Sequence, residues 1–212
     1  MQAENIVSSD SDYKFNNTNA SHTNAYLSPV IVSLCKKYKA TKVLDLGCGN
    51  GALAGDLAAA GFTVVGCDPS ESGIHYARQA VPQASFYLAG VYDEPRAVAE
   101  TDFDLVVSTE VVEHLFYPRH LPRFAAAKLK PGGILVLSTP YHGYGKNLVL
   151  SLLNKWDSHH TALWDGGHVK FWSCKTLTQL IEGEGFRFEK FIGCGRVPYL
   201  WKSMVVVGRK IS

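Results

Sequence analysis

The chain has 212 residues, of which 46% are hydrophobic and 19% are charged, a size and balance typical of one globular domain. Its 21 Lys and Arg residues against 19 Asp and Glu residues leave a formal net charge of +2, too small to indicate nucleic acid or an anionic membrane as a partner. The five cysteines are scattered, odd in number and never spaced Cys-x-x-Cys. This argues against a disulfide framework and a cysteine zinc site.

The beginning of the chain is polar and rich in Ser and Asn. This composition predicts a flexible arm over residues 1–22, followed by a single domain over residues 23–212. The arm has no apolar core of the signal-peptide type, and no stretch of the chain is long enough to span a bilayer. We therefore expect a cytoplasmic protein without stable membrane insertion, as a monomer or a homodimer.

Short apolar runs alternate with helical patterns along the domain. Glycines or polar capping residues such as Ser70 and Ser173 mark the ends of several helices. Helices are expected at 24–38, 52–60, 71–80, 121–129, 147–154 and 174–184, with short ones after Pro95 and at 111–115. Strands are expected at 42–46, 62–67, 84–88, 104–108, 134–138, 186–192 and 204–208.

This order of elements predicts an α/β fold. Strands that are apolar throughout and alternate with helices form a parallel sheet with helices on both faces. The connection 193–203 between the last two strands is too short for a helical crossover and suits an antiparallel reversal. The expected sheet is therefore mostly parallel with an antiparallel end.

A glycine-rich loop, Asp45-Leu46-Gly47-Cys48-Gly49-Asn50-Gly51, lies where the first strand turns into a helix. Its glycines, with Asp68 at the distance of a ribose-binding acid, also satisfy the dinucleotide pattern, so an NAD-binding oxidoreductase is one interpretation. Asp45 favours another, because a carboxylate there repels a pyrophosphate but attracts the ammonium and sulfonium of S-adenosylmethionine. A non-catalytic protein that binds S-adenosylmethionine is a third interpretation.

Four segments together resemble those of class I S-adenosylmethionine-dependent methyltransferases: 43–51, 66–70, 110–115 and 129–140. Within this superfamily the chain is most similar to the ubiquinone-pathway O-methyltransferases and related small-molecule enzymes. The resemblance implies a Rossmann-like seven-stranded sheet with an antiparallel last strand, and methyl transfer to a small molecule.

The resemblance also implies a set of cofactor-binding residues. Asp45 and the glycines would line the methionine part, Asp68 would hold the ribose, and Glu110 would lie beside the methionine and the substrate mouth. Many relatives place an acid after the third strand, near the adenine; here Asp93 comes late, so a backbone contact from Ala89 or Gly90 is expected instead. The full set is Asp45, Gly47, Cys48, Gly49, Asp68, Pro69, Gly90 and Glu110.

Glu110, Glu113 and His114 are spaced i, i+3 and i+4, which would place them on one face of a helix. Such a group can hold a divalent metal that polarises a substrate hydroxyl, as some ubiquinone-pathway relatives are thought to do. Alternatively, Glu110 contacts the cofactor and the other two pack in the interior. We favour this second interpretation and assign no metal ligand, because the motif also appears in many metal-independent relatives.

The segment 141–170 is a long connection without strand character, which is typical of a substrate pocket or lid. It is rich in Tyr, Trp and His, whose flat rings suit a planar, aromatic or lipid-like acceptor. A hydroxyl acceptor must lose a proton, and His142 and His168 are the candidate bases. The sequence thus predicts O-methyl transfer to a small molecule, with nitrogen, carbon or sulfur acceptors as alternatives and no nucleic-acid partner.

Overall fold

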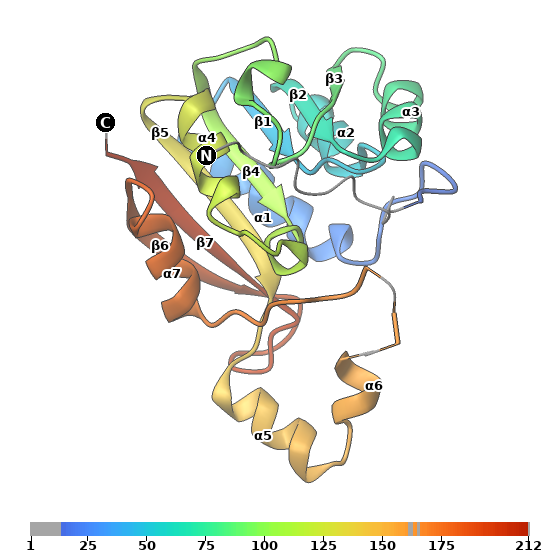
Figure 1. Cartoon of the computed structure of the whole chain (residues 1–212), viewed down its shortest axis with the longest axis vertical. Coiled ribbons are helices and arrows are strands. Elements are labelled where there is room, and N and C mark those ends of the chain that lie inside the picture. The colour runs from blue at the N-terminus through green and yellow to red at the C-terminus, as the bar shows by residue number, and fades with distance from the viewer. Residues whose placement is uncertain (1–13, 161–162, 165, 212) are drawn as a thin grey trace, which may run out of the picture.

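The computed structural model describes residues 14–160, 163–164 and 166–211, so residues 1–13 of the expected arm lie outside the described residues. Within this part of the chain, seven strands form one sheet in the order β3-β2-β1-β4-β5-β7-β6 (Figure 1). β7 is antiparallel to both of its neighbours, and the other pairs are parallel, which confirms the predicted fold. The strands are β1 (Lys42–Leu46), β2 (Thr63–Asp68), β3 (Ser85–Leu88), β4 (Phe103–Thr109), β5 (Leu129–Pro140), β6 (Phe186–Cys194) and β7 (Ser203–Lys210).

Helices cover both faces of the sheet, because the apolar side chains of each strand alternate between its two sides. Val43 and Val107 pack with α1 (Asn24–Lys37), α2 (Ala52–Ala59) and α3 (Glu71–Ala80). Leu44 and Val106 pack on the opposite face, with α4 (His120–Lys128) and α7 (Cys174–Glu182). None of the described helices is both long and apolar enough to cross a bilayer.

The predicted helix caps are confirmed where the side chains make the required bonds. Ser70 Oγ accepts from the Gly73 N–H at the start of α3. At α7, Ser173 and Thr176 form a reciprocal capping box, which satisfies two N–H groups that have no partner within the helix. These caps fix where each helix begins relative to the preceding strand.

The expected helix at 111–115 is wrong, because only one 3₁₀ turn, η2 (Val112–His114), forms there. Glu110 adopts a left-handed backbone with φ 55°, and Leu115 is already extended. Glu110 therefore does not share a helix face with Glu113 and His114. A second 3₁₀ turn, η1 (Pro95–Ala97), forms after β3 where a short helix was expected.

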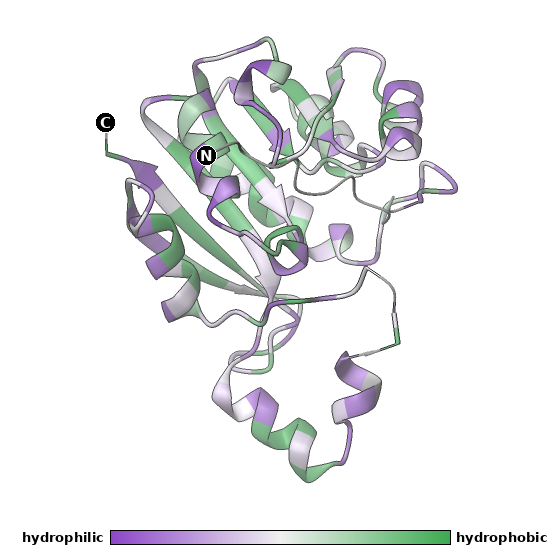
Figure 2. Ribbon diagram, in the orientation of Figure 1, coloured by the Kyte–Doolittle hydropathy of each residue, from purple (hydrophilic) through white to green (hydrophobic). Residues whose placement is uncertain are grey.

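The segment after β5 extends from the body at the edge where β4 and β5 end (Figure 1). It contains α5 (Tyr144–Leu152), close to the expected helix, and an additional short helix, α6 (Trp156–His160). Figure 2 shows apolar residues along α5 although this helix lies outside the main body. Leu148, Val149 and Leu152 are all exposed.

Candidate cofactor and acceptor site

β1 and β4 are neighbours at the centre of the sheet, and the loops that follow them meet there. From β1 the chain continues to β2 on one side, and from β4 it continues to β5 on the other side. Open α/β sheets bind ligands at such a switch point. Gly47 has φ 85°, and a Cβ on it would lie 2.5 Å from Val111 Cγ2. Only glycine fits there, because both its backbone conformation and its space exclude a side chain.

Asp45 is the most unusual charged group at this point. Its side chain is 1% exposed, and neither carboxylate oxygen has a hydrogen-bond partner among the described residues. Burial, and then the negative charge of Asp68, raise the pKa of Asp45 to about 7. A buried carboxyl without a partner is costly when ionised, so this position favours a cationic ligand.

Asp68, at the end of β2, holds the glycine loop in place. Its Oδ2 accepts from the Gly49 N–H at 2.8 Å, and its Oδ1 accepts from the Ser70 N–H at 2.8 Å. The residue remains partly exposed, and a carboxylate can accept more than one bond at each oxygen. Its predicted role at the ribose is therefore compatible with its structural bonds.

The loop after β3 closes the far end of the candidate site. The Gly90 N–H donates to Asp93 Oδ2 at 2.7 Å. Asp93, the acid that comes late after the third strand, therefore forms a hydrogen bond within its own loop. A Cβ on Gly90 would lie 3.3 Å from Pro69 Cβ, so these two predicted cofactor residues lie side by side. Cys48 is buried on the same side, with Sγ against Gly66.

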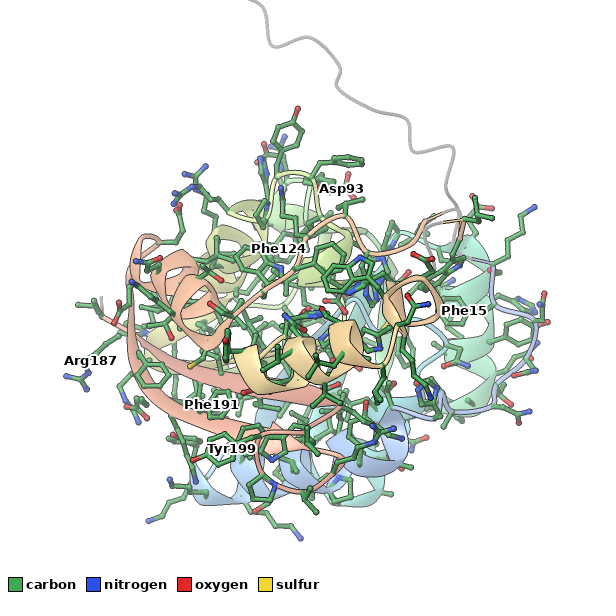
Figure 3. The ribbon with its side chains drawn as sticks, turned by 90° about the horizontal axis from the view of Figure 1, so that it is seen from below. Phe15, Asp93, Phe124, Arg187, Phe191 and Tyr199 are labelled. Atoms are coloured by element: carbon green, nitrogen blue, oxygen red, sulfur yellow. The ribbon has the colours of Figure 1, made fainter. Side chains whose placement is uncertain are left out.

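Part of the arm lies along the glycine loop, a contact that the sequence did not reveal. A Cβ on Gly49 would lie 2.7 Å from Phe15 Cζ, and the Phe15 N–H donates to Ser72 Oγ at 3.0 Å. The Asn50 side-chain amide donates to the carbonyls of Asn17 and Asn19. Figure 3 shows Phe15 beside α3. Two aromatic residues, Tyr13 and Phe15, in an otherwise polar stretch were its only signal.

Glu110 is held by hydroxyl groups from two neighbouring strands. The Ser138 hydroxyl donates to Oε1 at 2.8 Å and the Ser203 hydroxyl donates to Oε2 at 3.2 Å. Tyr26, from α1, bonds Ser203 Oγ at 3.0 Å. Burial raises the pKa of Glu110 to about 7, and the two hydroxyls and Lys146 limit that rise. The sequence predicted Glu110 as a residue of the candidate site, but it gave no indication of Ser138 or Ser203.

A second acid, Glu113, lies beside two histidines. It is 1% exposed, and burial followed by the charge of Glu110 raises its pKa. The Thr139 hydroxyl is near, but the Glu113 carboxylate oxygens make no hydrogen bond of ordinary geometry with the described residues. Donor atoms of Glu113, His114 and His168 lie within 4.8 Å of one another. This trio, and not the alternative set with Glu110, brings together ligand atoms that could hold a divalent transition metal.

The two candidate bases lie in separate groups of rings. His142 packs with His160 and Phe171, at centroid distances of 5.6 and 5.1 Å. His168 packs with His114 at 4.9 Å. Burial, and then neighbouring positive charges, lower the pKa of both to about 4. Both imidazoles are therefore neutral near pH 7 and able to accept a proton.

Residues 20–190 match a family model described as a methyltransferase domain. The chain belongs to the class I S-adenosylmethionine-dependent methyltransferases. S-adenosylmethionine is therefore its cofactor, and the NAD-dependent and non-catalytic interpretations are set aside. Asp45 was the sequence feature that favoured S-adenosylmethionine over NAD.

Curated and solved relatives of this methyltransferase agree with the assignment. The ubiquinone biosynthesis O-methyltransferase of Dinoroseobacter shibae is 34% identical over 157 residues, covering 70% of this chain and 60% of that protein. This chain thus spans less than two thirds of the length of that relative. The TehB-like S-adenosylmethionine-dependent methyltransferase of Corynebacterium glutamicum has 25% identity and a TM-score of 0.57, with 80% of both chains covered.

The magnesium protoporphyrin IX methyltransferase of Synechocystis, solved with bound S-adenosylhomocysteine, is similar in fold. Its TM-score is 0.67 over 87% of this chain and 82% of that one, at 18% identity. Such a low identity supports the shared architecture and nothing finer. The identity of the acceptor must be argued from the residues of this chain.

Proposed function

We propose that this methyltransferase acts on a hydroxyl oxygen of a small aromatic or lipid-like acceptor. The observation that carries the proposal is the gathering of imidazole and aromatic rings after β5, including His142 and His168, next to the Glu110 edge of the sheet. A hydroxyl must lose a proton during transfer, and neutral imidazoles can accept it. The name of the Dinoroseobacter shibae relative, an O-methyltransferase of ubiquinone biosynthesis, supports the same acceptor atom.

In this proposal the cofactor lies across the ends of β1, β2 and β4. Asp45 and Glu110 face the cationic methionine part, and Gly47, Cys48 and Gly49 let the backbone approach it. Asp68 binds the ribose hydroxyls. Pro69 and Gly90, which lie side by side, flank the adenine.

His168 is the favoured base of the two candidates, because the Glu113 carboxyl lies near enough to orient its ring. The acceptor oxygen attacks the methyl carbon in line with the S–CH₃ bond, whose electron pair returns to sulfur and leaves S-adenosylhomocysteine. The hydroxyl proton passes to the imidazole. His142 is the second candidate: burial and then the charge of Lys146 lower its pKa, whereas burial and neighbouring imidazoles alone lower that of His168.

A metal-dependent form of the same reaction is a second candidate, favoured by the buried, unpartnered carboxylate of Glu113. Glu113, His114 and His168 would hold a divalent ion. When bound, the ion would polarise the acceptor hydroxyl and lower its pKa. His168 would then be a ligand, and its ring would not be available as a base.

The proposal is tested by supplying S-adenosylmethionine with matched acceptors that differ only in the atom to be methylated. A suitable series has an apolar aromatic body and carries a phenol, an aniline or a thiophenol group. Mass spectrometry is expected to detect an O-methyl product, with S-adenosylhomocysteine formed in equal amount. Transfer to the aniline or thiophenol alone would contradict it.

A further inference from the structure

A group of positively charged and imidazole side chains lies at the base of α5, apart from the residues proposed to hold the cofactor. Lys146, in the first turn of α5, is only 9% exposed. Its Nζ donates to the Tyr141 carbonyl at 2.8 Å. Arg196, in the loop between β6 and β7, is close enough for its charge to lower the pKa of Lys146 to about 8, after the larger effect of burial. We call Lys146, Arg196, His142, His159 and His160 the cationic group.

The histidines of this group form one surface of stacked and edge-on rings. His142 and His160 stack at 5.6 Å with an interplanar angle of 21°, and His159 lies 5.0 Å from His160. Burial, and then the charge of Lys146, lower the pKa of all three. In addition, His160 Nε2 is buried without a hydrogen-bond partner in the part of the chain that the structure describes.

No acid of the described residues balances these charges by an ion pair. Neither Lys146 nor Arg196 forms a salt bridge within the described ranges, whereas Arg119, Arg123, Lys130, Arg187 and Arg209 all do. Glu110 is the acid whose charge reaches Lys146. Each of its oxygens accepts a bond from a hydroxyl, of Ser138 or of Ser203, and Glu110 forms no ion pair with Lys146.

Bound S-adenosylmethionine increases the imbalance. Its ammonium and sulfonium outweigh its carboxylate and add positive charge beside Glu110, which then faces the cofactor. A buried lysine with one backbone acceptor still has two N–H donors to satisfy. A second molecule that enters between the cofactor and α5 therefore meets unpaired cations on one side and ring faces on the other.

We propose that the cationic group binds an anionic substituent, a carboxylate or a phosphate ester, on the methyl acceptor. The acceptor is then an aromatic acid or phosphate, with its ring against His142 and Phe171 and its anion on Lys146 and Arg196. Arginine binds either anion through two parallel N–H donors, and lysine adds a point charge. This inference rests on the proposed function, because it assumes that the second ligand is the methyl acceptor.

The test measures binding without turnover, using the full chain saturated with S-adenosylhomocysteine. Calorimetric titrations with benzoate, phenyl phosphate and phenol compare a carboxylate, a phosphate and a neutral ring of similar size. We expect at least one anion to bind about tenfold or more tightly than phenol. Inorganic phosphate, titrated separately, shows whether the ring contributes, and weaker binding than phenyl phosphate is expected.

Substitutions assign the effect to the cationic group. Lys146→Gln and Arg196→Gln are each expected to reduce the preference for the anion over phenol about tenfold, and Lys146→Arg to retain most of it. Lys175→Gln, an exposed lysine on α7, removes the same charge and is expected to change nothing. Arg196 is exposed, so its replacement leaves the fold intact even if Lys146→Gln does not fold.

Two results would overturn the inference. One is equal affinity for phenol and both anions in the wild-type chain. The other is a loss of affinity for S-adenosylmethionine in Arg196→Gln and Lys146→Gln, because the group would then hold the carboxylate of the cofactor. Neither result depends on O-methyl transfer, which is measured separately with a neutral phenol, so failure of this inference is distinguishable from failure of the proposed function.

Discussion

The Ser203 hydroxyl lies 3.2 Å from Glu110 Oε2, although 93 positions separate the two residues in the chain. The bond joins the strand at the C-terminal end of the domain to the loop that follows β4. Together with Ser138, it fixes the direction of a carboxylate whose backbone is left-handed. Glu110 is thus oriented before any ligand binds, which is the condition for effective electrostatic stabilisation.

Removal of this bond should weaken cofactor binding. We expect Glu110→Gln to lower the affinity for S-adenosylmethionine by about 1.5–3 kcal/mol, the usual range for a hydrogen bond to a charged group, and Ser203→Ala to have a smaller effect in the same direction. Calorimetry with S-adenosylmethionine and S-adenosylhomocysteine measures both. Ser151→Ala, on exposed α5, is the control, and an unchanged affinity in Glu110→Gln would remove Glu110 from the cofactor site.

Asp45 should make the stability of the cofactor-free enzyme depend on pH. Its pKa in the folded protein, about 7, is higher than the ordinary aspartate value of 3.8, so the folded state holds this proton more tightly than the unfolded state. The free energy of unfolding therefore falls as the pH rises from about 4 to about 7, on the order of 1.4 kcal/mol per unit of the pKa difference.

The substitution Asp45→Asn removes this dependence. We expect a higher Tm than the wild type at pH 8, almost no difference at pH 4, and a much smaller Tm increase on addition of S-adenosylmethionine. Calorimetric unfolding at the two pH values checks this, with the exposed Asp56→Asn as the matched control. Glu110 contributes in the same pH range, so the difference between variant and wild type is the relevant quantity. A Tm lower than the wild type at pH 8 would contradict the prediction.

His168→Gln should reduce turnover and leave cofactor affinity unchanged. Loss of a general base costs about 10²–10⁴-fold in rate, and His142→Gln is expected to have a smaller effect. Because the pKa of both histidines lies near 4, neither should cause a fall in rate between pH 8 and pH 6. Steady-state kinetics on an accepted phenol measures this. His75→Gln, exposed on α3, is the control, and full activity in both variants would reject the assignment.

Chelation distinguishes the two proposed forms of the reaction. If His168 is the base, dialysis against EDTA should leave turnover unchanged. If Glu113, His114 and His168 hold a divalent ion, dialysis abolishes turnover and added Mn²⁺ or Zn²⁺ restores it. We expect retention, with no metal detected by elemental analysis of the active protein. Recovery of turnover on addition of metal would instead support the metal-dependent form of the reaction.

The sheet and its helices were predictable because each depends on short-range patterns. The apolar run 42–46, the glycine loop and the Ser173 cap each carry their information within a few residues. The prediction of a helix at 111–115 was wrong, because the backbone is left-handed at Glu110. The i, i+3, i+4 spacing gives no indication of that conformation. Helix periodicity indicates a tendency, and contacts from other elements decide the outcome.

The residues that the sequence did not reveal reach the site through long-range pairing. Ser138 lies near Glu110 because β5 pairs with β4, whereas Ser203 is brought there by the antiparallel pairing of β7 with β5. Phe15 contacts the glycine loop from an arm without regular structure. Lys146 was one of several lysines in the sequence, and its burial, which it shares with Lys128, is visible only in the structure. None of these positions has a local sequence pattern that marks it.

The place of β7 inside the sheet, between β5 and β6, imposes an order on assembly. β6 is synthesised before β7 but has no strand to pair with until β7 has formed. The half of the sheet made of β1 to β5 can therefore form first, while the half that orients Glu110 through Ser203 waits for the last strand of the domain. A chain cut before residue 203 would consequently lose an interior strand and expose two unpaired edges, so a nascent or truncated form is expected to aggregate rather than to persist as a partly active enzyme.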